Sequence, residues 1–375
     1  MLLPVEIRIV IPCYNEPEIR QTVQSLWACS QPACRTEVVV VVNSYLISPE
    51  TVRQFNRQTY DELNAFARKY NVPGLYLTPL LVEDLPGRQT GAGLPRKTGM
   101  DRAANQFESE NYPQGIIISL DADCTVAENY LTEIYRCFRQ YRLKSATIEF
   151  HHPVEHLPAT DNIRKAAEAY EGYLRYYRAA LAYTGYPYAF YTIGSAFAVT
   201  AQTYRQAGGM GKQQAGEDFY FLQKVFPLGK TQFIDSTCVY PSARTSSRVP
   251  FGTGTNIAQM LKNMDFKKLT YRIEAFTDLK NLFNQVNTFF RQPEPVVEQQ
   301  LSDLPLYTRK FLEEEHFIDK ISEINRYTTT PENFRKRFFY YFTAFKILKY
   351  LNFVHPNPYP LADAKEQWEK LHYLT

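Results

Sequence analysis

Three short apolar runs, each ended abruptly by polar residues, constrain the fold of this chain most strongly. They occupy residues 7–12, 37–42 and 115–120 and are rich in isoleucine and valine. A strand that is apolar on both faces is buried on both faces, which is typical of a parallel sheet covered by helices. Helices are predicted between these runs, over about 18–29, 49–70 and 96–107. The pattern therefore predicts an α/β fold with a mixed, mainly parallel sheet and helices on both faces.

Further elements follow the same reasoning along the rest of the chain. They are a short strand at 75–77 before a glycine-rich loop at 87–93, a strand at 145–150, a tyrosine-rich helix at 161–183, the start of a helix near 217, and a strand near 232–234. From about residue 256 the pattern is helical to residue 375, apart from a proline-rich stretch at 355–360. We expect an α/β domain over 1–255 and a helical C-terminal region over 256–375.

Asp121-Ala122-Asp123 follows the third apolar run directly. Ligands of open α/β sheets bind at the carboxyl ends of the strands, where these acids are expected. Acids at positions i and i+2 share one side of an extended chain, so both can address one divalent cation. An isolated D-x-D is also compatible with a solvated turn. Its position after a buried strand favours a ligand site.

Composition and missing motifs exclude several classes of protein. A net charge of +3 over 375 residues gives no argument for nucleic-acid binding. The chain lacks G-x-G-x-x-G after its first strand and lacks G-x-x-x-x-G-K-[ST], which disfavours dinucleotide-binding and P-loop enzymes. Aromatic residues make up 15% of the chain, which suits carbohydrate or lipid contact but also fills cores. The six cysteines show no C-x-x-C pair and are expected to be free thiols in a reducing cytoplasm.

Five motifs in a fixed order resemble those of family 2 glycosyltransferases of the GT-A fold. They are Ile11-Pro12-Cys13-Tyr14-Asn15-Glu16, the pair Arg96 and Gly99, Asp121-Ala122-Asp123, Gly194-Ser195-Ala196-Phe197, and Glu217-Asp218. The resemblance covers roughly residues 5–255. It implies a nucleotide-diphosphate sugar donor linked to UDP or GDP, Mg²⁺ or Mn²⁺, and transfer of the sugar to a hydroxyl acceptor.

The resemblance also implies roles for individual residues. Asp123 would ligate the metal, and Asp121 would contact the ribose or a metal-bound water. Asp218 would be the general base of an inverting reaction, with Glu217 orienting a loop or the acceptor. The expected donor-binding residues are Pro12, Tyr14, Glu16, Asn43, Arg96, Lys97, Asp121, Gly194, Ser195, Arg244 and Arg248. Gly194 would let the backbone approach the donor sugar, and the two late arginines would match phosphate oxygens.

The chain departs from the family pattern at three places. Asn43-Ser44 stands where members usually carry an acidic residue for the base and ribose, and Arg96-Lys97 stands where Arg-Asn is common. The C-terminal Q-x-x-R-W signature of processive members is absent, which favours a non-processive transferase. Donor sugar, acceptor, stereochemical outcome and oligomeric state are left open, and a glycan or lipid-linked acceptor is compatible with the sequence.

Two other functions fit the sequence less well. A sugar nucleotidyltransferase would carry a basic, glycine-rich loop after the first strand, where Tyr14-Asn15-Glu16 stands; a catalytically silent nucleotide-sugar-binding or scaffold protein would lose the acids. The N-terminus lacks the pattern of a signal peptide, and no apolar stretch approaches the ~20 residues of a membrane span. We expect a cytoplasmic protein. Residues 334–353, basic and aromatic, suit either a core helix or peripheral contact with an anionic membrane.

Overall fold

The computed structural model describes residues 4–86, 91–211, 216–245 and 252–375. These residues pack into two units, the first formed by 1–167 with 192–263 and the second by 168–191 with 264–375. The second unit thus includes residues 168–191, which the sequence analysis assigns to the α/β domain. The functional boundary at residue 255 stays a prediction.

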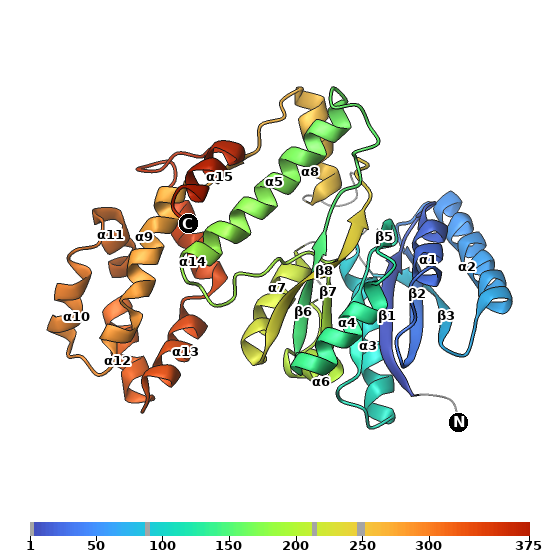
Figure 1. Ribbon diagram of the computed structural model, residues 1–375, viewed down its shortest axis with the longest axis horizontal. Coiled ribbons are helices and arrows are strands. Elements are labelled where there is room, and N and C mark those ends of the chain that lie inside the picture. Colours follow the sequence, from blue (N-terminus) through green and yellow to red (C-terminus); the bar gives the residue numbers. More distant parts are fainter. Residues whose placement is uncertain (1–3, 87–90, 212–215, 246–251) are drawn as a thin grey trace. The chain divides into compact units, whose positions relative to one another are not determined.

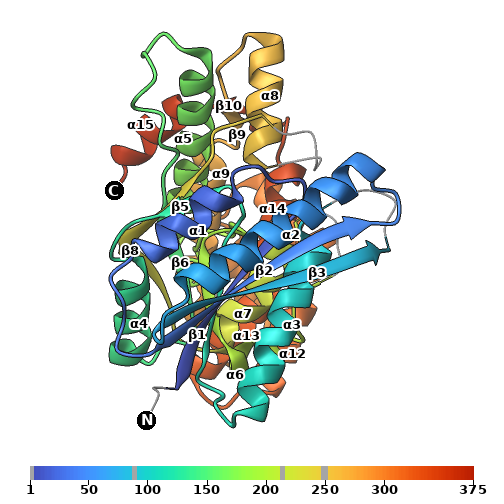
Figure 2. The same ribbon diagram turned by 90° about the vertical axis from the view of Figure 1, so that its right-hand side faces the viewer.

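The described part of the first unit contains one sheet of eight strands. They are β1 Val5–Cys13, β2 Arg35–Tyr45, β3 Leu75–Leu85, β4 Ile116–Ser119, β5 Cys124–Val126, β6 Ser145–Phe150, β7 Phe197–Thr200 and β8 Thr231–Pro241. Their order across the sheet is β3-β2-β1-β4-β7-β6-β8-β5. Strands β3, β2, β1 and β4 run parallel, as Figure 2 shows for the arrowheads of β2 and β3, whereas β7 is antiparallel to β4 and β6.

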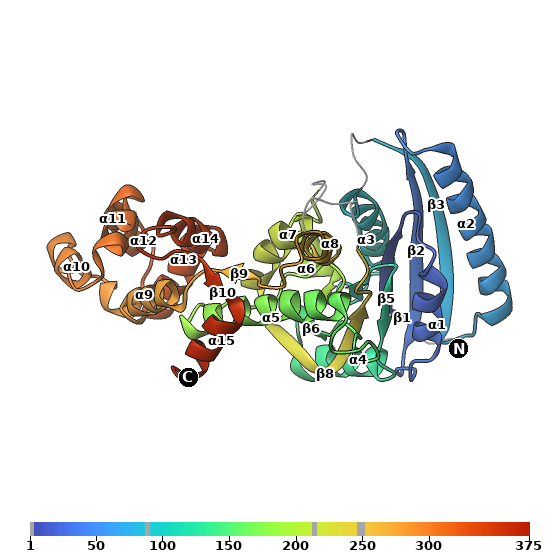
Figure 3. The ribbon, with the colours of Figure 1, turned by 90° about the horizontal axis from the view of Figure 1, so that it is seen from above.

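Helices cover both faces of this sheet. Those of the first unit are α1 Ile19–Trp27, α2 Glu50–Tyr70, α3 Gly93–Ser109, α4 Tyr130–Tyr141, α6 Ala201–Gln206, α7 Glu217–Val225 and α8 Thr253–Asn263, and α5 Asn162–Tyr183 runs from the first unit into the second. Figure 3 shows α2 and α3 on opposite sides of β1, β2 and β3. The predicted fold class, a mixed and mainly parallel α/β sheet with a helical C-terminal region, is confirmed.

Strand β3 is longer than the short strand predicted at 75–77. It pairs with β2 in parallel from Leu75 as far as Leu85, which lies opposite Tyr45. The prediction stopped early because Pro79 and the acids Glu83 and Asp84 interrupt the apolar pattern. An edge strand tolerates such residues, since one of its sides makes no ladder bonds and faces solvent. The extension carries polar side chains to the carboxyl edge of the sheet.

The second unit is helical, with one small exception. Its helices are α9 Ile273–Asn284, α10 Glu294–Leu301, α11 Leu306–Glu314, α12 Phe317–Arg326, α13 Pro331–Tyr341, α14 Ala344–Phe353 and α15 Ala364–His372 (Figure 1, orange to red). The short strands β9 Leu269–Thr270 and β10 Ala362–Asp363 pair antiparallel. The expectation of helix alone from residue 256 was therefore wrong at these two-residue strands, which are too short to show a period in sequence.

Aromatic side chains form the core of the second unit. Phe283 lies with its ring centroid 5.2 Å from those of Phe339 and Phe342, and Phe338 stacks against Phe342. Phe334, Phe338, Phe339 and Phe342 are all buried. These four phenylalanines are therefore core residues, whereas Tyr340 of the same segment is 45% exposed, and peripheral membrane contact stays a prediction. No helix in the described ranges is long and apolar enough to cross a membrane. The six cysteines all lie in these ranges, and none forms a disulfide bond there.

Gly99 sets how closely α3 approaches the sheet. A Cβ at this position would lie 2.4 Å from Val10 Cγ1 and 2.9 Å from Val41 Cγ2, which is closer than packed atoms tolerate. Gly99→Ala should therefore lower the free energy of unfolding by about 1–3 kcal/mol, as measured by urea denaturation. Gly74→Ala is the matched control, because a Cβ there meets nothing within 4 Å. Equal stability of the two variants would contradict this packing.

Candidate active site

The carboxylates of Asp121 and Asp123 lie at the carboxyl end of β4, as predicted. The backbone between them is a turn and not an extended chain, because the Cys124 amide donates to the Asp121 carbonyl at 3.2 Å. The expectation that both acids share one side of an extended chain was therefore wrong. β5 begins directly at Cys124 and pairs with β8, so the chain has to turn between the two strands. Each acid consequently meets a different arginine.

Arg96, from the first turn of α3, contacts four other groups of the site. Its Nη1 donates to Ser119 Oγ and to the Gly194 carbonyl, both at 2.7 Å, and its Nη2 donates to Asp121 Oδ1 at 2.9 Å. Its Nε lies 3.5 Å from Glu217 Oε1. The side chain is only 3% exposed. The structure therefore places Arg96, predicted to bind donor, among protein groups that it ties together.

Glu217 and Asp218 open α7, where Gly216 precedes them with a φ of 75° that favours glycine. The Phe219 amide donates to Asp218 Oδ1 at 2.7 Å. A Cβ at Gly194 would lie 2.9 Å from Arg96 Nη2 and 3.1 Å from Asp218 Oδ2. Gly194 is thus required by the protein's own packing, whether or not a sugar approaches it.

Burial controls the protonation of the acids at this edge. Burial raises the pKa of Glu217 and of Asp218, and the positive charge of Arg96 offsets part of that rise in both. Burial, followed by the negative charge of Asp121, raises the pKa of Asp123 to about 6 against the opposing effect of Arg244. A carboxylate with a raised pKa accepts a proton near neutral pH more readily than an ordinary one.

Arg244 bridges Asp123 and Glu16. The Ser242 amide donates to the Asp123 carbonyl at 3.1 Å, which brings the chain after β8 back to the turn. Arg244 Nη2 then donates to Asp123 Oδ2 at 3.0 Å, and Nη1 donates to Glu16 Oε1 at 2.8 Å while Nη2 also contacts Glu16 Oε2. The planar fork of an arginine suits such paired contacts.

The turn after β1 positions Glu16. Asn15 adopts a φ of 47°, a left-handed conformation that asparagine tolerates better than most residues. Its amide donates to Asn56 Oδ1 at 2.9 Å, and Asn56 Nδ2 donates to the Asn43 carbonyl at 2.7 Å. The Glu18 amide donates to Glu16 Oε1 at 3.1 Å. Asn56 therefore links the ends of β1 and β2, next to the predicted donor-binding residues.

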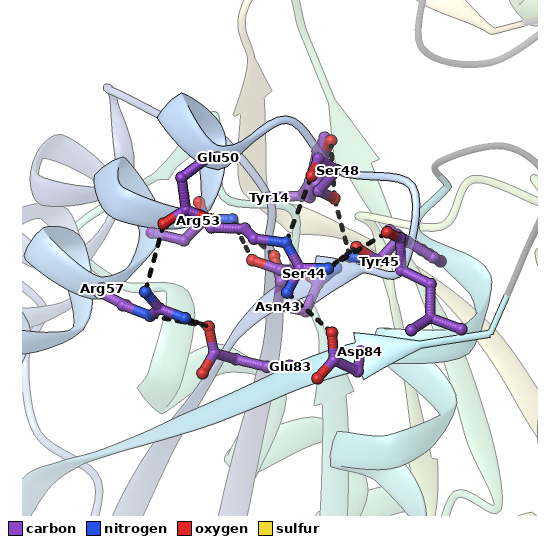
Figure 4. Close-up of polar contacts among 12 residues, drawn as sticks. Tyr14, Asn43, Ser44, Tyr45, Ser48, Glu50, Arg53, Arg57, Glu83 and Asp84 are labelled. Carbon is purple, nitrogen blue, oxygen red and sulfur yellow. Dashed lines mark hydrogen bonds and ion pairs between the residues drawn. The ribbon is translucent and has the colours of Figure 1, made fainter.

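Asn43 lies among polar residues at the ends of β2 and β3, together with Ser44, Tyr45 and Ser48 (Figure 4). Its side chain is 0% exposed, and neither amide atom has a hydrogen-bond partner. Contact with a nucleotide base would therefore require movement of the groups that cover it. Ser48 Oγ donates to Tyr14 Oη at 3.3 Å, and the Tyr14 and Tyr45 rings meet edge to face.

The remaining predicted residues lie at or near this edge, with one outside the described ranges. Pro12 is buried near the end of β1, and Ser195 is buried beside Gly194. Lys97 Nζ pairs with Asp101 Oδ2 at 2.7 Å on its own helix. Arg248 lies outside the described residues. Thus the structure brings together Glu16, Arg96, Asp121, Asp123, Gly194, Glu217, Asp218 and Arg244.

Acids outnumber arginines in this cluster. It combines five carboxylates, those of Glu16, Asp121, Asp123, Glu217 and Asp218, with two guanidinium groups, those of Arg96 and Arg244. Oxygen donors are those that Mg²⁺ and Mn²⁺ prefer. Among the described residues no group of three or more His, Cys, Asp or Glu side chains is arranged to hold a metal. Phosphate oxygens and water would therefore have to complete the shell.

Two residues of the site were not predicted from the sequence. Ser119 Oγ accepts from Arg96 and donates to the Gly194 carbonyl at 2.6 Å. Asn56 carries the link between β1 and β2 described above. A hydroxyl in the otherwise apolar run Ile116–Leu120 was a usable signal for Ser119. Asn56 gave no signal, because an asparagine on a helix surface is indistinguishable in sequence from a solvated one.

Comparison with known proteins gave no match to a protein-family model and no match among curated proteins. Among solved structures, S. aureus TarS 1–349 in complex with UDP-GlcNAc has a TM-score of 0.44 at 13% identity, covering 90% of this chain and 91% of that chain. Its complex with UDP has a TM-score of 0.42 at 13% identity with the same coverage. S. aureus TarS 1–349 itself has 0.40 at 14% identity, covering 63% of this chain and 60% of that chain. Values of this size leave the function to be argued from this chain's own residues.

Proposed function

We propose that this protein is a GT-A glycosyltransferase that moves a sugar from a nucleotide-diphosphate donor to a hydroxyl acceptor with inversion. One observation carries the proposal. Acids and arginines from helices α3 and α7 and from the segments that follow β1, β4 and β8 converge at the carboxyl edge of one sheet. A single ion pair is common in any protein. A cluster of five carboxylates at the ligand-binding edge of an α/β sheet is expected of a site for a metal-bound phosphate.

The residues divide the chemistry between them. Asp218 would accept the proton of the acceptor hydroxyl while the oxygen of that hydroxyl forms a bond to the anomeric carbon of the donor sugar. The bond between this carbon and the diphosphate oxygen would break on the opposite side. Arg96 would keep Glu217 and Asp121 in place, and Arg244 would contact the departing diphosphate. A divalent cation held by Asp123 and Asp121 would neutralise the charge that develops on the diphosphate.

The test is a donor screen. The full chain would be incubated with UDP- and GDP-linked sugars, with Mn²⁺ or EDTA, and release of the nucleoside diphosphate would be measured together with binding by calorimetry. We expect one nucleotide class to bind and its sugar donor to be hydrolysed slowly, because water can replace a missing acceptor. Binding without turnover would favour the silent nucleotide-sugar-binding alternative. If no UDP- or GDP-linked sugar binds, the proposed function is wrong.

A further inference from the structure

Arg244 already pairs with Asp123, the acid that would hold the metal under the proposed function. Its Nη2 donates to Asp123 Oδ2 at 3.0 Å, and the same guanidinium makes paired contacts with Glu16. The Glu16 side chain is only 3% exposed and Asp123 is 28% exposed, so the arginine neutralises one fully buried acid and one partly buried acid together. Removal of a cation from such a pair leaves uncompensated buried charge.

A divalent ion held by Asp123 would share this carboxylate with Arg244. A divalent ion that binds Oδ2 displaces Arg244 from that oxygen, since two cations at hydrogen-bonding distance from one oxygen repel each other. A displaced Arg244 would lose its contact with Asp123 and keep its contact with Glu16. Its guanidinium group would then have N–H donors free for another anion. A diphosphate beside the metal offers the guanidinium a replacement anion of matching geometry. When metal and diphosphate bind together, Asp123 pairs with the metal and Arg244 pairs with the diphosphate. When the metal binds alone, nothing replaces Asp123 as a partner of Arg244.

We propose that Arg244 is an internal cation that competes with the divalent metal for Asp123 and transfers to the diphosphate, so that metal and nucleotide bind cooperatively. This inference rests on the proposed function and adds that metal and nucleotide strengthen each other's binding. Free Mn²⁺ binds weakly because it must displace Arg244. The diphosphate removes that competition by giving Arg244 a new partner. Linkage requires that the metal strengthen diphosphate binding by the same factor.

The experiment is a binding cycle that needs no turnover. The affinity of the full chain for Mn²⁺ would be measured by electron paramagnetic resonance, alone and with saturating UDP, GDP or inorganic pyrophosphate. Pyrophosphate carries no base and therefore probes the phosphate contacts alone. The variants are Arg244→Met and Arg244→Gln, which remove the charge, and Arg244→Lys, which keeps it without the fork. Arg20→Met is the control, because Arg20 is an exposed cation on α1. Thermal unfolding would show that each variant is folded.

In the unchanged protein we expect the diphosphate to strengthen Mn²⁺ binding at least ~10-fold, within the usual range of coupling between two ligands. The two neutral variants should bind Mn²⁺ alone about 5–10-fold more tightly and lose most of that coupling. Arg244→Lys and Arg20→Met should bind Mn²⁺ alone as the unchanged protein does.

Two outcomes overturn the inference and leave the proposed function standing. One is coupling in the neutral variants equal to that of the unchanged protein. The other is equally tight Mn²⁺ binding by Arg244→Met and Arg244→Lys, which would show that the charge of Arg244 does not compete. If the unchanged protein binds neither UDP, GDP nor pyrophosphate with Mn²⁺, the proposed function itself fails. Low coupling in a variant that unfolds at the normal temperature supports the inference, because the fold is then intact.

Discussion

Asp218→Asn is expected to lower the rate of sugar transfer by about 10²–10⁴-fold while leaving donor affinity nearly unchanged. Asparagine has almost the same shape as aspartate, and its carbonyl oxygen can still accept from the Phe219 amide, which donates to Asp218 Oδ1 at 2.7 Å. It cannot take up a proton. The loss should therefore appear in kcat, measured with the donor identified by the screen and an acceptor, and not in the dissociation constant of the donor.

The pH dependence of the unchanged protein follows from the same residue. A general base acts only when it is ionised, so kcat should fall as the pH is lowered through the pKa of Asp218. Burial raises that pKa, against the opposing charge of Arg96, so the fall should begin above the value of about 3.9 typical of an exposed aspartate. Any residual activity of Asp218→Asn should lack this acid limb, because the titrating group is gone.

Asp235→Asn is the matched control for that prediction. Asp235 is an exposed acid on β8, so the substitution removes the same charge from the same unit away from the acids of the site. It should change kcat less than about 2-fold, as surface substitutions usually do. An Asp218→Asn variant that transfers sugar at the control's rate would remove Asp218 as the base and would leave Glu217 as the acid to test.

The sheet could be predicted from sequence because hydrophobic burial alone encodes it. Residues 7–12, 37–42 and 115–120 are apolar on both faces apart from single polar residues such as Arg8 and Glu37, and a parallel sheet covered by helices buries both faces. The stop before Asp121 followed from the same pattern, whereas the stop predicted at Asn43 was wrong, because β2 continues to Tyr45. The antiparallel strand β7 and the short β5 were missed, since three or four residues are too few to show a period.

The contacts within the site could not be predicted in the same way. Sequence order placed Arg96, Asp121 and Glu217 in one motif set, and the resemblance assigned Arg96 to the donor. The anion with which an arginine pairs depends on the distances between helix α3, the turn after β4 and helix α7. The close packing at Gly99 and Gly194 sets these distances. Similarly, Asn43 was predicted to face a base, whereas the structure buries it. Local pattern identifies charged residues, and tertiary packing decides their partners.

Arg96→Met is expected to lower the free energy of unfolding by about 3–5 kcal/mol at neutral pH, as removal of one partner of a buried ion pair does. Four groups each lose one donor or counter-charge together: Ser119 Oγ, the Gly194 carbonyl, Asp121 and the buried Glu217. Methionine fills much of the space of the arginine stem, so the loss reports charge and hydrogen bonding more than volume. Urea denaturation measures it. Lys97→Met, one residue along α3, is the control and should cost about 0.5 kcal/mol or less, because Lys97 pairs with Asp101 in a half-exposed (i, i+4) contact.

The sign of the pH dependence distinguishes this explanation from a general loss of packing. Burial already raises the pKa of Glu217 and Asp218, and Arg96 holds both below what burial alone would give. Without Arg96 the pKa of each acid in the folded protein rises further above its unfolded value of about 4, so between those two values the folded state binds more protons than the unfolded state. Stability of the variant then falls as the pH rises through that interval. The difference in the free energy of unfolding between the unchanged protein and Arg96→Met should accordingly be smallest near pH 4–5. It should reach its full size once the pH exceeds the raised pKa values of Glu217 and Asp218 in the variant. A deficit of the same size at every pH would mean that Arg96 stabilises the site through packing and not as the counter-charge of these two acids.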